Sequence, residues 1–290
     1  MDEFHNILKK YNEDYILDKL ESLDKLIPFA GTFYKDVAEI YDCITRVKNV
    51  SRNPTGFSLN DAPILGLLIR IWKLLKQIIR YYEEDNAEII SILDRPLIEA
   101  AITATYLLIN TDEVIEDYRK CSYKDRLRIL KESRGNSPFF QLKPGIRLLR
   151  SIEEKMQLDG FSEDSFLEQK RNKWKVQGKS FFEIFSEVEH DDMYKYSYGI
   201  MSESVHGSWN ESMDFCLLKN DDKTFSAYPF YHPADIRYVT PTLRFCNFPY
   251  RLWLKRIDVE DDYLFNVLNW VDKINARLYQ AFDLLYDEMG

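Results

Sequence analysis

The chain has 290 residues, of which 45% are hydrophobic and 14% aromatic, with only 10 Gly and 10 Pro. This apolar content argues against a disordered chain, and the scarcity of Gly and Pro favours helices over a β-sandwich or barrel. The net charge of −9 argues against a dedicated duplex-binding protein, because such proteins usually contain a basic domain.

The charge is unevenly distributed along the chain. Residues 119–179 contain 16 basic and 8 acidic side chains, which gives this segment a net charge of +8 and leaves −17 for the remainder. Two interpretations follow. The segment forms an anion-binding face, or its charges are solvated or paired with the acidic residues around them, and the second interpretation is favoured.

The sequence lacks the usual signs of a metal site, a signal peptide and a membrane span. The four cysteines are far apart and none has metal-ligand spacing to a histidine; they are Cys43, Cys121, Cys216 and Cys246. The first residues, MDEFHNILKK, do not resemble a signal peptide. The most apolar stretches, residues 62–69 and 100–109, are too short to span a bilayer. We therefore expect a cytoplasmic protein with reduced thiols, no metal, no cofactor and no membrane contact.

The N-terminal part reads as a helical pair. Apolar residues recur at helical spacing over residues 2–26 and again over residues 29–50, and Pro28 interrupts the pattern. Residues 51–58 are rich in turn-forming side chains and form a linker. This pattern predicts a first unit over residues 1–57.

The next unit is predicted over residues 58–210 as a helical bundle. A broadly apolar helix covers residues 60–84 and a second covers residues 87–110. Pro96 lies inside the second helix, so this helix either kinks near Asp94 or restarts there with Asp94 as its N-cap. Further helices are predicted over residues 112–132, 145–158, 162–174 and 180–189, with a loop at residues 174–179, and a last one from Asp191 to near Gly207.

The last unit, residues 211–290, is predicted to pack on this bundle. Residues 215–230 read as a β-hairpin with its turn at residues 220–222. Residues 233–257 form a helix interrupted at Pro241 and Pro249, and residues 258–289 form a long closing helix. The predicted fold class is therefore mainly α: a multi-helix bundle with one short β-hairpin.

Residues 191–210 contain polar side chains spaced four apart: Tyr194, Tyr198, Ser202 and His206. On an α-helix this spacing places them along one face. His206 precedes Gly207 and is either a histidine stabilised at a helix C-terminus or an acid–base group with Ser202 one turn away. A serine hydrolase is disfavoured because the sequence has no GxSxG motif.

A second pair, Arg95 and Glu99, also lies four residues apart, inside an apolar helix. One interpretation is a buried ion pair that fixes helix register. The other makes Arg95 an anion-binding group and Glu99 its orienter or a general base. Trp174 either packs in the core or covers a cleft. The sequence contains no P-loop, no GxGxxG and no HExxH motif.

These motifs together resemble the bacterial domain of unknown function 5677 family over about residues 65–209. They are Arg95-x-x-x-Glu99 within RPLIEAAITATYLL, Trp174 with Gly178-Lys179-Ser180, and the series from Tyr194 through Tyr198 and Ser202 to His206-Gly207. The resemblance implies an all-helical protein of a family without an agreed activity.

A looser likeness is to the HEPN helical superfamily, whose ribonucleases use an Arg a few residues before a His, across a dimer. This sequence departs from that pattern, because residues 199–201 contain no Arg before His206. A HEPN-like site would need Arg95 to supply the cation from another helix. This likeness is an analogy of fold and does not establish function.

Two functional hypotheses follow. In the first, the chain is a bacterial phage-defence or stress factor that binds RNA or a small phosphate-bearing ligand without a metal, and the catalytic residues are Arg95, Glu99, Ser202 and His206. Tyr194, Tyr198, Trp174 and Lys179 would contact this ligand. In the second, the chain is a non-catalytic helical module that binds a second copy or another protein, and the same residues form a structural polar network.

Overall fold

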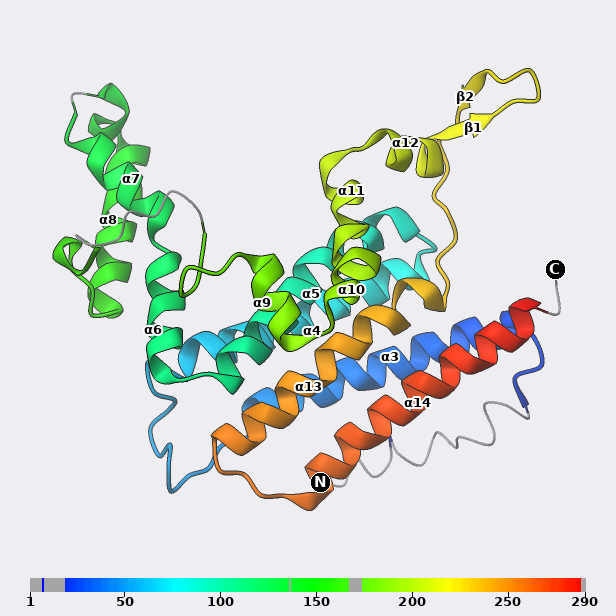
Figure 1. Ribbon diagram of the computed structural model, residues 1–290, viewed down its shortest axis with the longest axis horizontal. Helices are drawn as coiled ribbons and strands as arrows, with labels where there is room; N and C mark the ends of the chain where they lie inside the picture. The colour runs from blue at the N-terminus through cyan, green and yellow to red at the C-terminus, as the bar shows by residue number, and fades with distance from the viewer. Residues whose placement is uncertain (1–6, 8–18, 136, 167–173, 288–290) are drawn as a thin grey trace.

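The computed structural model describes residues 7, 19–135, 137–166 and 174–287. Five long helices form a bundle (Figure 1), in which α5 packs against α4 and α13, α3 packs against α4, and α14 packs against α13 and α3. These helices are α3 (Leu23–Arg46), α4 (Ala62–Glu83), α5 (Ala87–Ile109), α13 (Thr240–Arg256) and α14 (Asp262–Asp287). The prediction of a mainly α fold with one short hairpin is confirmed. Among the described helices, none is long and apolar enough to cross a membrane.

Helix α5 lies at the centre of the molecule because it is apolar around most of its circumference. It begins after Asn86, whose side chain accepts a hydrogen bond from the Ile89 N–H at 3.2 Å. The helix continues through Pro96, so the predicted restart with Asp94 as N-cap is wrong. Pro96 has no N–H to donate to the carbonyl of Ile92, so α5 loses one intrahelical hydrogen bond there.

Helix α3 differs from its prediction at its start. Pro28 does not separate two helices but lies inside α3, in the second turn, where its missing N–H costs one intrahelical hydrogen bond. Tyr34 and Tyr41 are buried on the inner face of α3, and their hydroxyls contact Thr240 Oγ1 at 2.6 Å and Asn247 Oδ1 at 3.2 Å on α13. Most of the helix predicted over residues 2–26 lies outside the described residues.

One hydrophobic cluster joins the five long helices. Its largest fully buried side chains are Trp253, Tyr34, Tyr41, Tyr106 and Tyr250. The Tyr250 hydroxyl donates to the Leu68 carbonyl at 2.8 Å, which links α13 to α4. Residues on both sides of the predicted boundaries contribute to this cluster, and the three-part division of the chain stays a prediction.

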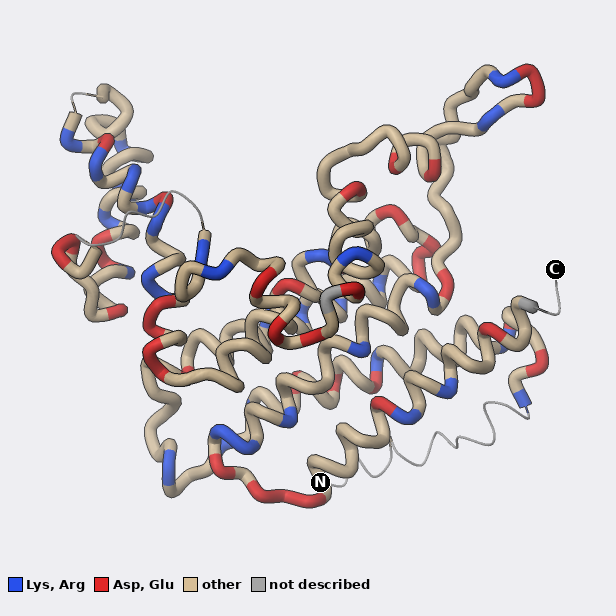
Figure 2. Tube along the Cα trace, viewed as in Figure 1, with Lys and Arg blue, Asp and Glu red and all other residues tan. Residues whose placement is uncertain are grey.

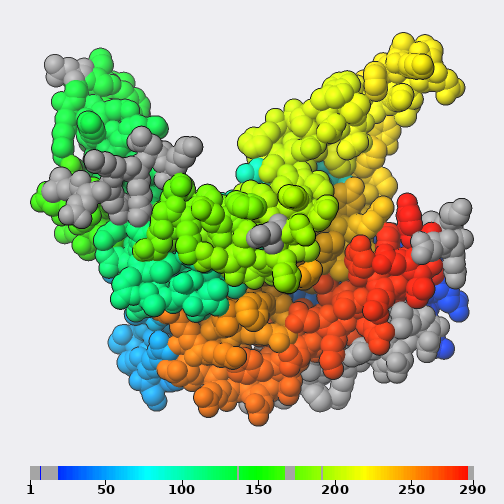
Figure 3. All heavy atoms as spheres, viewed as in Figure 1, coloured from blue at the N-terminus to red at the C-terminus, as the bar shows by residue number. Residues whose placement is uncertain are grey.

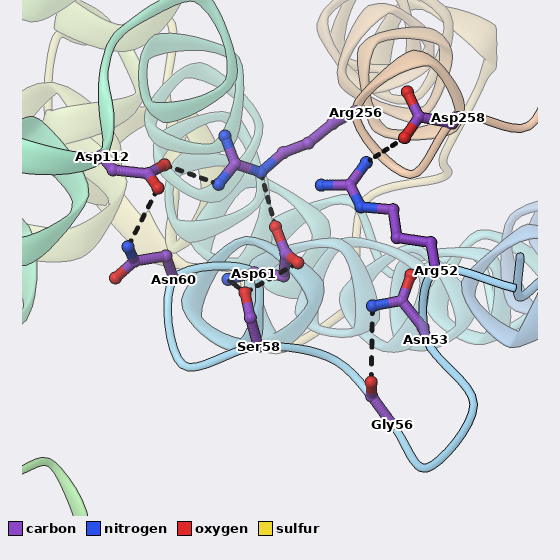
Figure 4. A network of polar contacts seen from close by, with 9 residues as sticks. All are labelled: Arg52, Asn53, Gly56, Ser58, Asn60, Asp61, Asp112, Arg256 and Asp258. Carbon is purple, nitrogen blue, oxygen red and sulfur yellow. Dashed lines mark hydrogen bonds and ion pairs between the residues drawn. The ribbon is translucent and has the colours of Figure 1, made fainter.

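A polar network closes one end of the bundle (Figure 4). Arg256, at the end of α13, contacts Asp61 before α4 and Asp112 at the start of α6 (Asp112–Cys121), with N–O distances of 2.7 and 2.8 Å. Ser58 donates its hydroxyl to Asp61 Oδ2 at 2.8 Å. Arg52 pairs with Asp258 at 3.0 Å. These contacts tie the loop before α4 to the loop after α13.

One arm projects from the bundle through α6 and is formed by residues 124–166; we call it the α7–α8 arm (Figure 1). Its elements are α7 (Lys124–Ser133), η1 (Pro138–Gln141), α8 (Lys143–Leu158) and η2 (Glu163–Phe166). The helix predicted over residues 112–132 is therefore wrong as one element. It breaks because Cys121 is buried in the bundle core, whereas Tyr123 is buried in a second, smaller cluster.

Some of the charges on and next to the α7–α8 arm are paired. Figure 2 shows basic and acidic residues interspersed there. Carboxylates pair with four arginines: Arg119, Arg128, Arg134 and Arg150. Other basic residues of the arm, such as Lys124, Lys143 and Arg147, form no ion pair with a described residue. The choice between the two interpretations of the basic segment therefore stays a prediction.

A second arm, which we call the hairpin arm, is formed by residues 201–231 and projects from the same side of the bundle (Figure 1). The space-filling view shows open space between the two arms (Figure 3). The arm contains α11 (Met201–His206), α12 (Trp209–Phe215), β1 (Leu217–Lys219) and β2 (Phe225–Ala227). The two strands form the predicted hairpin; they are antiparallel, and Leu217 lies opposite Ala227.

The segment that leads into this arm is not one α-helix. After α9 (Phe181–Val188) come α10 (Asp191–Tyr194), a π-helical turn η3 (Lys195–Gly199), and α11. Helix α11 ends at Gly207, which has a left-handed conformation with φ +60°. The prediction of one regular α-helix from Asp191 is therefore wrong at the π-helical turn, whereas its predicted end near Gly207 is confirmed. A short 3₁₀-helix, η4 (Ile236–Tyr238), leads from the hairpin arm to α13.

Candidate functional site

The candidate site lies where α5 meets the π-helical turn and α11. Arg95 is half-buried on α5, Tyr198 is buried in η3, and His206 is exposed at the end of α11. Helices α5 and α11 are in direct contact. The fold therefore brings together three polar residues that come from distant parts of the sequence.

Arg95 is the centre of this cluster. Its Nε donates to the Tyr198 hydroxyl at 3.1 Å, and its guanidinium carbon lies 4.8 Å from the centroid of the Tyr198 ring. Its NH1 lies 3.3 Å from Nε2 of His206. Because arginine can only donate, this contact requires His206 Nε2 to be the acceptor and places the imidazole proton on Nδ1.

The electrostatics of the cluster favour an anion. Among the side chains that the structure describes, Arg95 forms no ion pair, although it is half-buried. Burial raises the pKa of Tyr198, the charge of Glu99 raises it further, and the hydrogen bond from Arg95 lowers it. Tyr198 is therefore protonated at neutral pH, and Arg95 is a cation without a carboxylate partner.

Two other members of the predicted stripe have supporting positions. Tyr194 packs against Tyr198, with ring centroids 5.3 Å apart, and its edge meets Phe182 and Phe185. Ser202 donates its hydroxyl to the carbonyl of Tyr198 at 3.3 Å, within its own helical segment. Among the described residues no hydrogen bond joins Ser202 to His206, so the geometry gives no sign of a serine activated by histidine.

Glu99 does not pair with Arg95. It faces a separate cleft of about 260 Å³ between α4, α5 and α6, which Trp174 also lines. Tyr118 forms another wall, with its ring edge-on to Trp174 at 6.3 Å between centroids. The predicted convergence of Arg95, Glu99, Ser202 and His206 in one pocket is thus not the observed geometry; the catalytic roles stay a prediction.

Lys179 is placed elsewhere. Its ammonium pairs with Glu187 at 2.5 Å and lies 5.6 Å from the centroid of the Tyr106 ring. The hydrogen bond with Glu187 raises the pKa of Lys179. In the described structure Lys179 has no contact with Arg95 or His206, so it is not part of the cluster.

Sequence reasoning missed two residues of the cleft, Arg70 and Tyr118. The sequence could have pointed to Arg70, because it is the only charged residue in the apolar stretch over residues 64–72. Tyr118 had no such signal, because it lies on α6 among charged residues and reaches the cleft only through the tertiary fold. Within the described residues, no group of three or more His, Cys, Asp or Glu side chains could hold a metal ion.

Comparison with models of known protein families identifies the family of the chain. The model of a family of unknown function, DUF5677, matches residues 61–225, which is more than half of the sequence. The chain belongs to the DUF5677 family. The resemblance inferred over residues 65–209 is confirmed. The DUF5677 match contains Arg95, Glu99, Tyr198 and His206, whereas α13 and α14 lie beyond it. No curated protein and no solved structure matches the chain.

Proposed function

We propose that the Arg95–His206 site of this DUF5677 protein binds a phosphodiester of RNA, and that His206 acts as acid and base in its cleavage. The observation that carries this proposal is the unpaired guanidinium of Arg95, held 3.3 Å from an exposed imidazole. A half-buried cation without a carboxylate attracts an anion, and a guanidinium matches the geometry of phosphate oxygens.

The reaction needs no metal. In this proposal the bound phosphate takes the NH1 hydrogen bond of Arg95 away from His206, which frees Nε2. His206 Nε2 then accepts the proton of the ribose 2′-hydroxyl, and the 2′-oxygen attacks the adjacent phosphorus. The bond from phosphorus to the 5′-oxygen breaks, and the imidazolium returns its proton to that oxygen. Arg95 stabilises the charge that develops on the phosphoryl oxygens. The products are a 2′,3′-cyclic phosphate and a 5′-hydroxyl.

The surface beside His206 supports RNA over free phosphate. Trp209 follows His206 after a tight turn and is 59% exposed, and its ring contacts Phe225, with centroids 5.7 Å apart. Exposed aromatic rings beside a cation are the features on which unpaired bases stack. The proposed setting is the cytoplasm of a bacterium, in phage defence or stress. It rests on the likeness to HEPN ribonucleases and on the widely spaced cysteines.

The proposal can be tested with two substitutions and a matched control. His206→Ala removes the acid–base group, and Arg95→Gln removes the cation while keeping a donor for Tyr198. His190→Ala is the control, because His190 is also exposed but makes no side-chain cap. The assay is cleavage of 5′-labelled RNA in EDTA, with detection of cyclic phosphate ends. We expect His206→Ala to lower the rate by about 100-fold or more, and His190→Ala to retain it.

The second candidate function is a non-catalytic interaction module, and one observation favours it. The hairpin arm exposes a series of large apolar side chains: Trp209, Leu218, Phe225, Phe230 and Tyr231. In this case the contact of Arg95 with Tyr198 has a structural role and holds the hairpin arm on α5. No RNA cleavage by the wild type, together with lower thermal stability of both His206→Ala and Arg95→Gln, would favour this module and contradict the ribonuclease.

A further inference from the structure

The cleft that contains Glu99 is distinct from the Arg95–His206 site but lies one helical turn away along α5. Its volume is about 260 Å³, and it is lined by Leu67, Arg70, Pro96, Glu99, Ala100, Thr103, Tyr118 and Trp174. Pockets for drug-sized ligands are usually larger, about 300–1,000 Å³. This cleft therefore suits a compact group such as a single ring system.

Two opposite charges face this cleft without neutralising each other. Within the described residues, neither Arg70 nor Glu99 forms an ion pair or a side-chain hydrogen bond. Both charges affect the pKa of the Tyr118 hydroxyl. Burial raises this pKa, the charge of Glu99 raises it further, and the charge of Arg70 lowers it. A donor fork and an acceptor carboxylate are thus both available to a ligand in the same small space.

The walls of the cleft are aromatic as well as polar. Trp174 and Tyr118 meet edge to face, with their ring centroids 6.3 Å apart. Tyr198, which contacts Arg95, is also close enough to Glu99 for the carboxylate to raise its pKa. The cleft and the Arg95–His206 site are therefore close neighbours. A nucleotide of RNA could place its phosphate at the Arg95–His206 site and its base in the cleft.

We propose that this cleft binds a guanine base, with Glu99 accepting hydrogen bonds from N1–H and N2–H, Arg70 donating to O6 and N7, and Trp174 stacking on the ring. Guanine presents paired donors and paired acceptors on adjacent edges, and arginine is the usual partner of its O6 and N7. Extruded RNA bases are read in this way, by stacking and by edge hydrogen bonds. This inference rests on the proposed function and gives it a substrate class: RNA with guanine at the cleavage site.

The first experiment measures nucleotide binding to the full-length chain by calorimetry, with GMP, IMP and AMP as probes. IMP lacks only the N2 amino group of GMP, so it isolates one donor to Glu99. We expect GMP to bind about tenfold more tightly than AMP, and IMP to bind between them. Glu99→Gln and Arg70→Gln should each weaken GMP binding about tenfold. Arg80→Gln is the matched control for Arg70→Gln. Arg80 lies on the same helix as Arg70, α4, but it is exposed and pairs with Glu84.

The outcomes separate the two proposals. GMP preference in both wild type and His206→Ala, with RNA cleavage only in the wild type, supports both. GMP preference without any RNA cleavage supports the cleft and contradicts the ribonuclease. Equal binding of GMP and AMP, or binding of a zwitterionic amino acid such as glycine in place of GMP, overturns the guanine cleft even if RNA is cleaved. Unchanged GMP affinity in Glu99→Gln overturns it as well.

Discussion

The ion pair between Arg256 and Asp61 gives the sharpest test of what holds the bundle end together. The Asp61 side chain is 3% exposed and that of Arg256 is 17% exposed, with 2.7 Å between Nε and Oδ1. Arg256→Met would leave the buried Asp61 carboxylate without its cation, a change that typically costs about 3–5 kcal/mol. Asp112→Asn removes the other contact of Arg256. The Asp112 side chain is 58% exposed, and such pairs are worth about 0–1 kcal/mol.

The assay is urea unfolding of the full-length chain at neutral pH, followed by circular dichroism. The double variant Asp61→Asn/Arg256→Met no longer contains a buried unpaired charge, so it should recover about 1–3 kcal/mol relative to Arg256→Met alone. Equal losses in Arg256→Met and Asp112→Asn would refute the reasoning, because the burial of Asp61 would then have no energetic effect. Simple additivity of the two substitutions in the double variant would refute it too.

Three further predictions concern single positions. Gly207→Ala should destabilise the protein by about 1–2 kcal/mol, because the φ of Gly207 is +60°, even though the added Cβ would meet no atom. Gly66→Ala is the control and should not destabilise the protein, because Gly66 has free space and an ordinary helical φ. Both variants are measured by urea unfolding. Ser180→Ala removes the capping box with Glu183 and should cost about 1 kcal/mol in the same assay. Burial raises the pKa of Asp94 well above its usual range, so this group destabilises the fold increasingly as pH rises above its unfolded pKa. The gain in unfolding free energy from Asp94→Asn should therefore grow as pH rises above about 4, by up to about 1.4 kcal/mol per pH unit, until the folded pKa is passed.

The sequence predicts the parts of the fold that depend on local pattern. Helices α4 and α5 follow from long apolar runs, and the hairpin follows from a turn between two β-prone segments. The breaks were not predictable in the same way. The break after Cys121 depends on neighbouring residues being buried in different clusters, and helical spacing contains no information about that.

The candidate site was predictable only in part, for a similar reason. Spacing of four singled out Arg95 and His206, and the fold places them in contact. The same spacing suggested an ion pair between Arg95 and Glu99, but Arg95 contacts Tyr198 in the π-helical turn and Glu99 faces the cleft. A π-helical turn has no sequence signature here, so the position of Tyr198 follows from tertiary packing alone.

The α7–α8 arm has a hydrophobic cluster of its own, separate from the core that holds α5. Its buried members are Tyr123, Leu130, Ile152, Met156 and Phe166. So few side chains give a unit of low local stability, which can open while the bundle stays folded. The Arg95–His206 site does not depend on that cluster for its position. Opening of the arm would therefore leave the contact between Arg95 and His206 in place.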